Sequence, residues 1–115
     1  MCDFSTLLGK TLVSVENRGD EELIFTTTSG KVFMLYHPQD CCEYVSIEDI
    51  CGDLNDLVGS PILRAEENES DDPEASESGT WTYYKLDTAK GDVVVRWYGS
   101  SNGYYSESVY FTEVK

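Results

Sequence analysis

Apolar and polar residues alternate with a period of two over much of this chain, which is the pattern of half-buried β-strands. In the first third, alternation or β-forming residues fill residues 11–16, 22–28 and 31–36. A Ser-Gly pair at 29–30, a tight-turn signal, separates the last two segments. We therefore expect three successive antiparallel strands, the third ending just before His37.

The last third carries the strongest strand signal. Residues 80–88 are aromatic and alternating, residues 92–98 hold three consecutive valines and a tryptophan, and residues 105–114 complete a meander. Glycine-containing turns separate these segments at 90–91 and 99–103.

The middle of the chain allows two interpretations. Residues 43–50 form either a fourth strand or a strand that passes into a short helix at Ser46. An aspartate at the N-cap and a closing glycine indicate short helices within residues 3–9 and 53–59. Residues 61–65 return to an extended segment.

These elements predict an α+β fold, mostly antiparallel β-sheet of about six to seven strands with one or two short helices. We expect a single domain over residues 1–115, with an acidic flexible loop at 66–79. Seven carboxylates without a base fill this segment, in company with serines and a proline: Glu66, Glu67, Glu69, Asp71, Asp72, Glu74 and Glu77. Low hydrophobicity and high charge favour a solvated, mobile loop.

The charge of the chain argues against one class of function. Eight Lys and Arg stand against 22 Asp and Glu, a formal net charge of −14. We expect no direct nucleic acid binding, because such binding needs clustered bases to displace counterions, and the same argument opposes anionic membranes. The charge favours docking onto a basic surface, where the acidic segment would imitate a phosphate strand. A solvated loop without a partner is the other interpretation.

The only histidine and three of the four cysteines lie between residues 37 and 51. Imidazole and thiolate hold zinc in closed tetrahedral sites, so their clustering predicts a structural Zn²⁺ site. The preferred ligands are His37, Cys41, Cys42 and Cys51, with Asp40, Glu43 or Glu48 in place of a sulfur that faces away. The spacing contains no Cys-x-x-Cys pair, and cysteines packed as small hydrophobes explain the same residues without a metal.

The cysteines are expected to remain reduced. No signal peptide and no apolar run of membrane-spanning length is evident in the sequence. We therefore expect a cytoplasmic protein, in which disulfides are rare.

Tyrosine and tryptophan are frequent, with eight and two residues respectively. Most should be core and cross-strand residues. Tyr104, Tyr105 and Tyr110, near the turn at 99–103, are candidate partner contacts because tyrosine is enriched at interface hot spots.

A catalytic interpretation finds little support. The sequence has no phosphate-binding glycine loop, no nucleophile elbow and no His-Glu-x-x-His helix. We expect no enzymatic activity. The alternative is a small metal-dependent enzyme with an open zinc position.

Several runs of residues support a resemblance: YH (36–37), QDCCE (39–43), IEDICGDL (47–54), LVGSPI (57–62) and RWYGSSNGYYSESV (96–109). Through them the chain resembles a family of small, acidic phage and prophage proteins, over residues 9–114. Within that group it is most similar to type II-A anti-CRISPR proteins, which inhibit an RNA-guided DNA nuclease.

The resemblance implies a phage protein that acts in the host bacterial cytoplasm. The resemblance points to the host CRISPR-associated nuclease as the target, and the negative charge of the chain predicts that it binds a basic surface there stoichiometrically and blocks nucleic-acid loading. We expect the protein to be a monomer. The candidate contact residues are acidic or aromatic: Glu66, Glu67, Glu69, Asp71, Asp72, Glu74, Tyr104 and Tyr105. The alternative is another phage accessory protein or a small metal-dependent enzyme acting on host defence.

Overall fold

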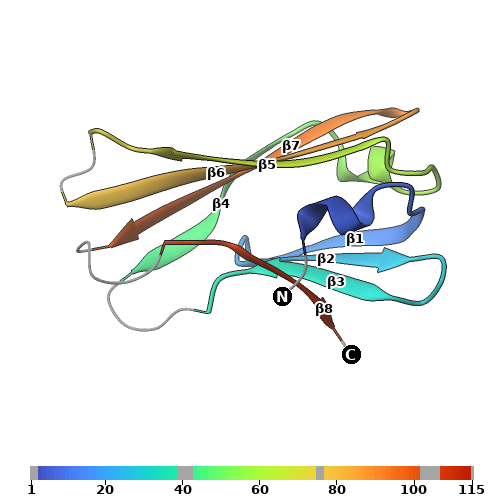
Figure 1. Cartoon of the computed structure of the whole chain (residues 1–115), viewed down its shortest axis with the longest axis horizontal. Coiled ribbons are helices and arrows are strands. Elements are labelled where there is room, and N and C mark those ends of the chain that lie inside the picture. The colour runs from blue at the N-terminus through green and yellow to red at the C-terminus, as the bar shows by residue number, and fades with distance from the viewer. Residues whose placement is uncertain (1–2, 39–42, 75–76, 102–106, 115) are drawn as a thin grey trace.

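Two four-stranded antiparallel sheets pack face to face in the computed structural model, which describes residues 3–38, 43–74, 77–101 and 107–114 (Figure 1). The first sheet, in the order β1-β2-β3-β8, comprises β1 (Leu12–Arg18), β2 (Glu22–Thr27), β3 (Val32–Tyr36) and β8 (Tyr110–Val114). The second sheet, in the order β4-β7-β6-β5, comprises β4 (Tyr44–Cys51), β5 (Arg64–Asp71), β6 (Ser78–Thr88) and β7 (Gly91–Ser101).

One apolar core fills the space between the sheets and follows the alternation seen in the sequence. On β2, Leu23 and Phe25 are buried, and on β7 the buried apolar side chains are Val93, Val95 and Trp97. The residues between them are half-buried or exposed. Each large apolar side chain buried in this way contributes about 1.5–3 kcal/mol to folding.

An aromatic cluster closes one side of the core. The ring of Phe4 lies 4.7 Å from that of Tyr84 and 5.3 Å from that of Phe111. Phe111 in turn stacks on Phe33, with ring centroids 5.4 Å apart. Phe4 thus joins the first sheet to the second.

Both predicted helices exist, but each is a single 3₁₀ turn, η1 (Phe4–Leu7) and η2 (Leu54–Leu57). Asp3 and Asp53 cap these turns as expected, and Gly9 and Gly59 follow them with positive φ. Cap and glycine lie too close together for a longer helix, so the α+β prediction is wrong and the fold is mostly β. No helix in the described part of the chain is long and apolar enough to cross a membrane.

Seven of the eight observed strands lie on segments that the sequence predicts. Residues 43–50 belong to strand β4, which continues to Cys51, so the interpretation with a helix at Ser46 is wrong. The eighth strand, β5, is the one that the alternation did not indicate.

The acidic flexible loop predicted for residues 66–79 is wrong for residues 66–71, which belong to β5, and for residues 78–79, which begin β6. β5 pairs with β6 from Arg64, opposite Asp87, to Asp71, opposite Thr80. Of its eight residues one, Ala65, is buried. Its own sequence therefore carries no alternating pattern, and backbone hydrogen bonds to β6 hold it extended.

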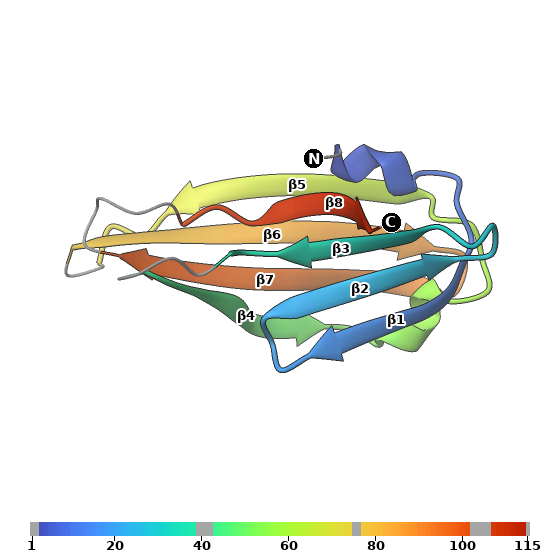
Figure 2. The same ribbon diagram turned by 90° about the horizontal axis from the view of Figure 1, so that it is seen from below.

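Several connections meet at one end of the sandwich, on the left in Figure 2. β5 and β7 end there, β4 and β6 begin there, and β3 points toward it. The strand register places Ser100 opposite Tyr44 and Ser101 opposite Ser78. We call this region the loop end of the sandwich.

Candidate functional site

β5 presents an unpaired backbone edge, because it is the last strand of the second sheet. The amide of Asp72 donates to the carbonyl of Gly79 at 2.8 Å. Backbone groups alternate in direction along an antiparallel strand, so Glu67, Glu69 and Asp71 direct theirs to the side away from β6. These groups have no backbone partner among the described residues. η1 lies beside the first half of β5 (Figure 2), and no other helix or strand of the described chain lies along the free edge of its second half.

The same three residues carry carboxylates on the side of β5 that faces the other sheet. Glu67, Glu69 and Asp71 follow Ala65, which is buried, with a period of two. Glu67 accepts a hydrogen bond from the Tyr84 hydroxyl at 2.6 Å. Burial, and then this bond, raise the pKa of Tyr84, so the phenol remains a donor. We call Glu67, Glu69 and Asp71 the acidic edge.

The arginines of the second sheet form their ion pairs on its outer face, away from the acidic edge. Arg64 Nη2 lies 2.8 Å from Glu66 Oε2, and this hydrogen bond lowers the pKa of Glu66. Arg96 pairs in the same way with Glu48 on β4. No salt bridge reaches the acidic edge from the described parts of the chain.

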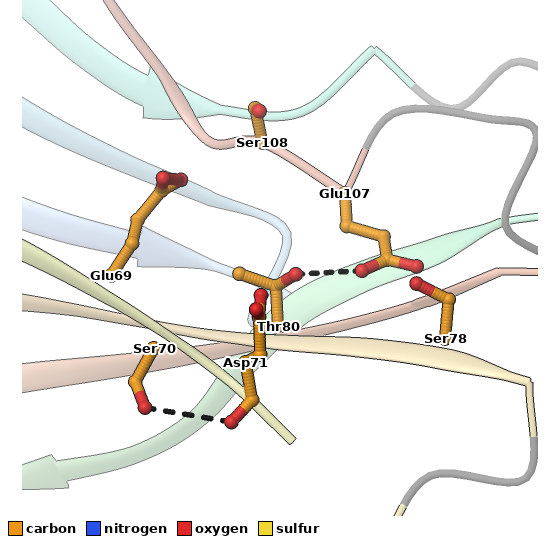
Figure 3. A pocket seen from close by; sticks show the side chains of 7 residues that line it. All are labelled: Glu69, Ser70, Asp71, Ser78, Thr80, Glu107 and Ser108. Atoms are coloured by element: carbon orange, nitrogen blue, oxygen red, sulfur yellow. Dashed lines mark hydrogen bonds between the residues drawn. The ribbon is translucent and has the colours of Figure 1, made fainter. Parts of the chain in front are cut away.

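A groove of ≈ 340 Å³ continues the acidic edge at the loop end (Figure 3). The residues that line it are all of polar or acidic types: Glu69, Ser70, Asp71, Ser78, Thr80, Glu107 and Ser108. Three of these side chains are carboxylates and none is a base. The groove therefore suits a cationic group better than an anionic or apolar one.

Glu107 is held in place by hydroxyl groups from the second sheet. Thr80 Oγ1 donates to it at 2.7 Å, as Figure 3 shows, and Ser101 Oγ donates at 2.6 Å. Burial acts to raise the pKa of Glu107, but hydrogen bonds from Ser101, Thr80 and Ser78 outweigh it and the pKa is lowered. The group is therefore a fixed carboxylate at neutral pH.

Gly99 allows this arrangement. A Cβ atom at Gly99 would lie 2.9 Å from both the Cβ and the carbonyl oxygen of Glu107. β7 needs glycine at this position so that the segment before β8 can pass close over it.

His37 lies buried at the same end of the sandwich, 6% exposed. Its Nδ1 is 2.6 Å from the carbonyl oxygen of Ser108, and its Nε2 is 3.6 Å from Glu43 Oε2. A carbonyl can only accept, so Nδ1 carries a hydrogen. Nε2 points toward a buried carboxylate without forming a hydrogen bond to any described residue.

The structure separates two of the four predicted zinc ligands. Glu43 beside His37 precedes the start of β4, whereas Cys51 is its last residue. At about 3.3 Å per residue, that strand spans about 23 Å. Because zinc–ligand distances are about 2.0–2.3 Å, Cys51 cannot share an ion with His37, and the set that includes it is wrong.

Cys51 instead is exposed, and its Sγ lies 3.6 Å from Asp49 Oδ2. The predicted ligands Cys41 and Cys42, and the substitute Asp40, lie outside the described residues. Glu48 pairs with Arg96 on the outer face of the sheet. Of the two oxygen ligands that the structure describes, Glu43 lies beside His37 and Glu48 does not.

The structure places the acidic residues that were predicted as partner contacts on β5 and in the segment that follows it. Glu66, Glu67, Glu69 and Asp71 lie on β5, and Asp72 and Glu74 follow it. Asp72 accepts a hydrogen bond from the Tyr98 hydroxyl at 2.7 Å. Tyr104 and Tyr105 lie outside the described residues, and Tyr110 is half-buried on β8 near His37. Their role as contacts stays a prediction.

Sequence reasoning missed the cluster around Glu107. Its hydroxyl donors come from the start of β6 and the end of β7, far from it in the chain or across a connection. No local motif links these residues. To predict this cluster one would need to know which residues of β6 and β7 lie opposite each other, and the sequence alone does not provide that register.

Comparison with known proteins adds a family but no activity. Searches of curated proteins and of solved structures each found no significant match. One family model matches residues 5–111, nearly the whole chain. The chain therefore belongs to the family described as a domain of unknown function, DUF7448.

Proposed function

We propose that this protein is a non-enzymatic, stoichiometric inhibitor that binds a basic surface of another protein through its acidic edge, Glu67, Glu69 and Asp71. One observation carries the proposal: within the described part of the chain, the same three residues of β5 have backbone groups without a backbone partner and carboxylates without a paired cation. Open strand edges pair with extended segments of partner proteins. The carboxylates select a partner with Lys or Arg at that segment.

A second copy of the chain is a poor partner for this edge. Pairing of two β5 strands would bring carboxylates opposite carboxylates, which is destabilising. The net charge of −14 adds a general repulsion between copies. Acidic residues on an edge strand can also serve only to prevent aggregation, and in that case the edge would have no tight-binding partner.

Binding measurements therefore distinguish an edge that only prevents aggregation from one that binds a partner protein.

The resemblance to phage anti-CRISPR proteins indicates which partner to test. RNA-guided nucleases hold their guide–target heteroduplex in a positively charged channel. An acidic strand edge that enters this channel first would block nucleic-acid loading, without chemical turnover. The large negative charge of the whole domain would steer it there at long range.

Titration of the purified type II-A nuclease with and without bound DNA tests this function. We expect saturation at about one inhibitor per nuclease and much weaker binding once DNA is loaded. Absence of binding at low salt, with folded protein, would remove the nuclease as partner. Equal affinity for both nuclease states would rule out a block on loading. Inactivation by far less than one equivalent would instead support the enzyme alternative.

A further inference from the structure

A buried imidazole–carboxylate pair joins the two sheets at the loop end. His37 directly follows β3 of the first sheet, and Glu43 directly precedes β4 of the second. The two side chains are each 2% exposed, with Nε2 and Oε2 3.6 Å apart. Burial of a polar atom such as His37 Nε2 is costly unless a partner compensates it.

Contact with Glu43 does not supply a hydrogen bond to His37 Nε2. A separation of 3.6 Å is too long for a hydrogen bond. Within the described residues, His37 Nε2 has no other hydrogen-bond partner. Among the side chains that the structure describes, one other buried nitrogen or oxygen atom lacks a hydrogen-bond partner, Trp97 Nε1 in the core.

We propose that a zinc ion binds between His37 Nε2 and Glu43 Oε2. Zinc–nitrogen and zinc–oxygen distances of about 2.0–2.1 Å in tetrahedral geometry place neighbouring ligand atoms about 3.4 Å apart. The observed 3.6 Å is close to this spacing. The contact of Nδ1 with the Ser108 carbonyl at 2.6 Å also fits, since metal-binding histidines usually donate their other ring hydrogen to such a group.

The ligand types favour zinc over the common alkaline-earth cations. Calcium and magnesium prefer sites built from oxygen ligands, whereas an imidazole nitrogen with a carboxylate suits zinc. The described residues hold no group of three or more His, Cys, Asp and Glu side chains that would complete such a site. The proposal is confined to the two ligands that the structure places together.

The role of this ion would be structural. It would tie the end of β3 to the beginning of β4 and so join the two sheets at the loop end. The competing interpretation is an imidazolium–carboxylate ion pair without a metal. The two interpretations differ in metal content and in the response to chelation.

The test begins with the full chain purified without added metal. We expect about one zinc per chain by elemental analysis, and a melting temperature that falls after EDTA treatment and recovers when Zn²⁺ is added. Glu43→Gln and His37→Gln keep the side-chain size and should weaken Zn²⁺ binding at least about 10-fold in calorimetric titration. Cys51→Ser is the matched control and should bind zinc as the unsubstituted chain does.

Zinc-edge X-ray absorption of the unsubstituted chain keeps the test valid if the variants do not fold. An imidazole signal together with oxygen near 2.0 Å is the expected result. No zinc in the purified chain, with no binding of added Zn²⁺, would overturn the proposal in favour of the ion pair. Zinc bound by sulfur alone, or unchanged affinity in both folded variants, would overturn the assigned ligands.

Discussion

At the scale of single residues, Glu107 shows how neighbouring hydroxyl groups decide the state of a carboxylate. Burial alone favours the neutral acid, yet the hydrogen bonds from Ser101, Thr80 and Ser78 favour the anion more strongly. The result is a fixed negative charge at the wall of the groove. The carboxylate therefore does not have to change position when a cation enters the groove.

Replacement of this residue gives a prediction for stability against pH. The pKa of folded Glu107 lies below its ordinary value, so the stabilisation is present above that ordinary pKa and is lost as pH falls through the folded pKa. Glu107→Gln should therefore lower the free energy of unfolding by about 1 kcal/mol at pH 7. The deficit should shrink toward pH 3.

Urea unfolding of both proteins at the two pH values measures this difference. Glu21→Gln, in the exposed turn between β1 and β2, is the control and should change little at either pH. A deficit for Glu107→Gln that stays constant or grows on acidification would contradict the assigned role of the hydroxyl groups.

The residue scale also shows why the metal-site prediction was partly wrong. His37 and Cys51 are close in sequence, and this closeness suggested a shared ion. The residues between them include the whole of β4, which is extended and carries Cys51 away from His37. Glu43, which the sequence offered only as a replacement, is the side chain that the structure places beside His37. The number of residues between two side chains could not show that Glu43, and not Cys51, lies beside His37.

At the scale of elements, strands with a buried face were predictable and β5 was not. β2, β6 and β7 each alternate buried with more exposed residues, which is visible in their sequences. β5 buries one residue, so its acidic composition predicted a loop. Its conformation depends on hydrogen bonds to the backbone of β6, a strand that its own aromatic and alternating sequence predicts. A strand of this kind can be identified from its partner but not from its own residues.

Two proline substitutions test which side of β5 is open. The amide of Asn68 is directed to β6 and that of Glu69 to the free edge, and both side chains are exposed. Asn68→Pro removes a ladder hydrogen bond and leaves a carbonyl of β6 without its donor, so it should destabilise the protein by about 1–3 kcal/mol. Glu69→Pro should cost much less, because proline is tolerated where the amide faces solvent on an edge strand.

Thermal or urea unfolding of the two variants provides the comparison. Each variant serves as the control for the other, since both place proline in the same strand at exposed positions. Equal destabilisation, or greater destabilisation by Glu69→Pro, would show that the free side of β5 has been assigned incorrectly.

At the scale of the whole molecule, charge and architecture act together. The net charge of −14 makes association with any basic partner faster at low salt, whichever surface makes contact. This general attraction is screened beyond about 10 Å at 0.1 M salt. The acidic edge would act at contact distance, where screening is weaker. The two contributions can be separated by comparing variants that lose the same number of negative charges at different places on the surface.

The most direct test of the acidic edge as the binding surface compares two triple variants with the same net charge. Glu67→Gln, Glu69→Gln and Asp71→Asn neutralise the edge and retain its hydrogen-bonding groups. Glu16→Gln, Glu21→Gln and Glu22→Gln remove three charges from the hairpin of β1 and β2 in the first sheet. The measurement is the affinity of each folded variant for the purified nuclease at low and at physiological salt.

We expect the edge variant to bind about 10- to 100-fold more weakly than the unsubstituted protein, since each lost contact is worth about 0.5–1 kcal/mol. The hairpin variant should lose no more than about 3-fold, and mainly at low salt. Equal losses for both variants at both salt concentrations would contradict the account, because the nuclease would then respond to the total charge and not to the acidic edge of β5.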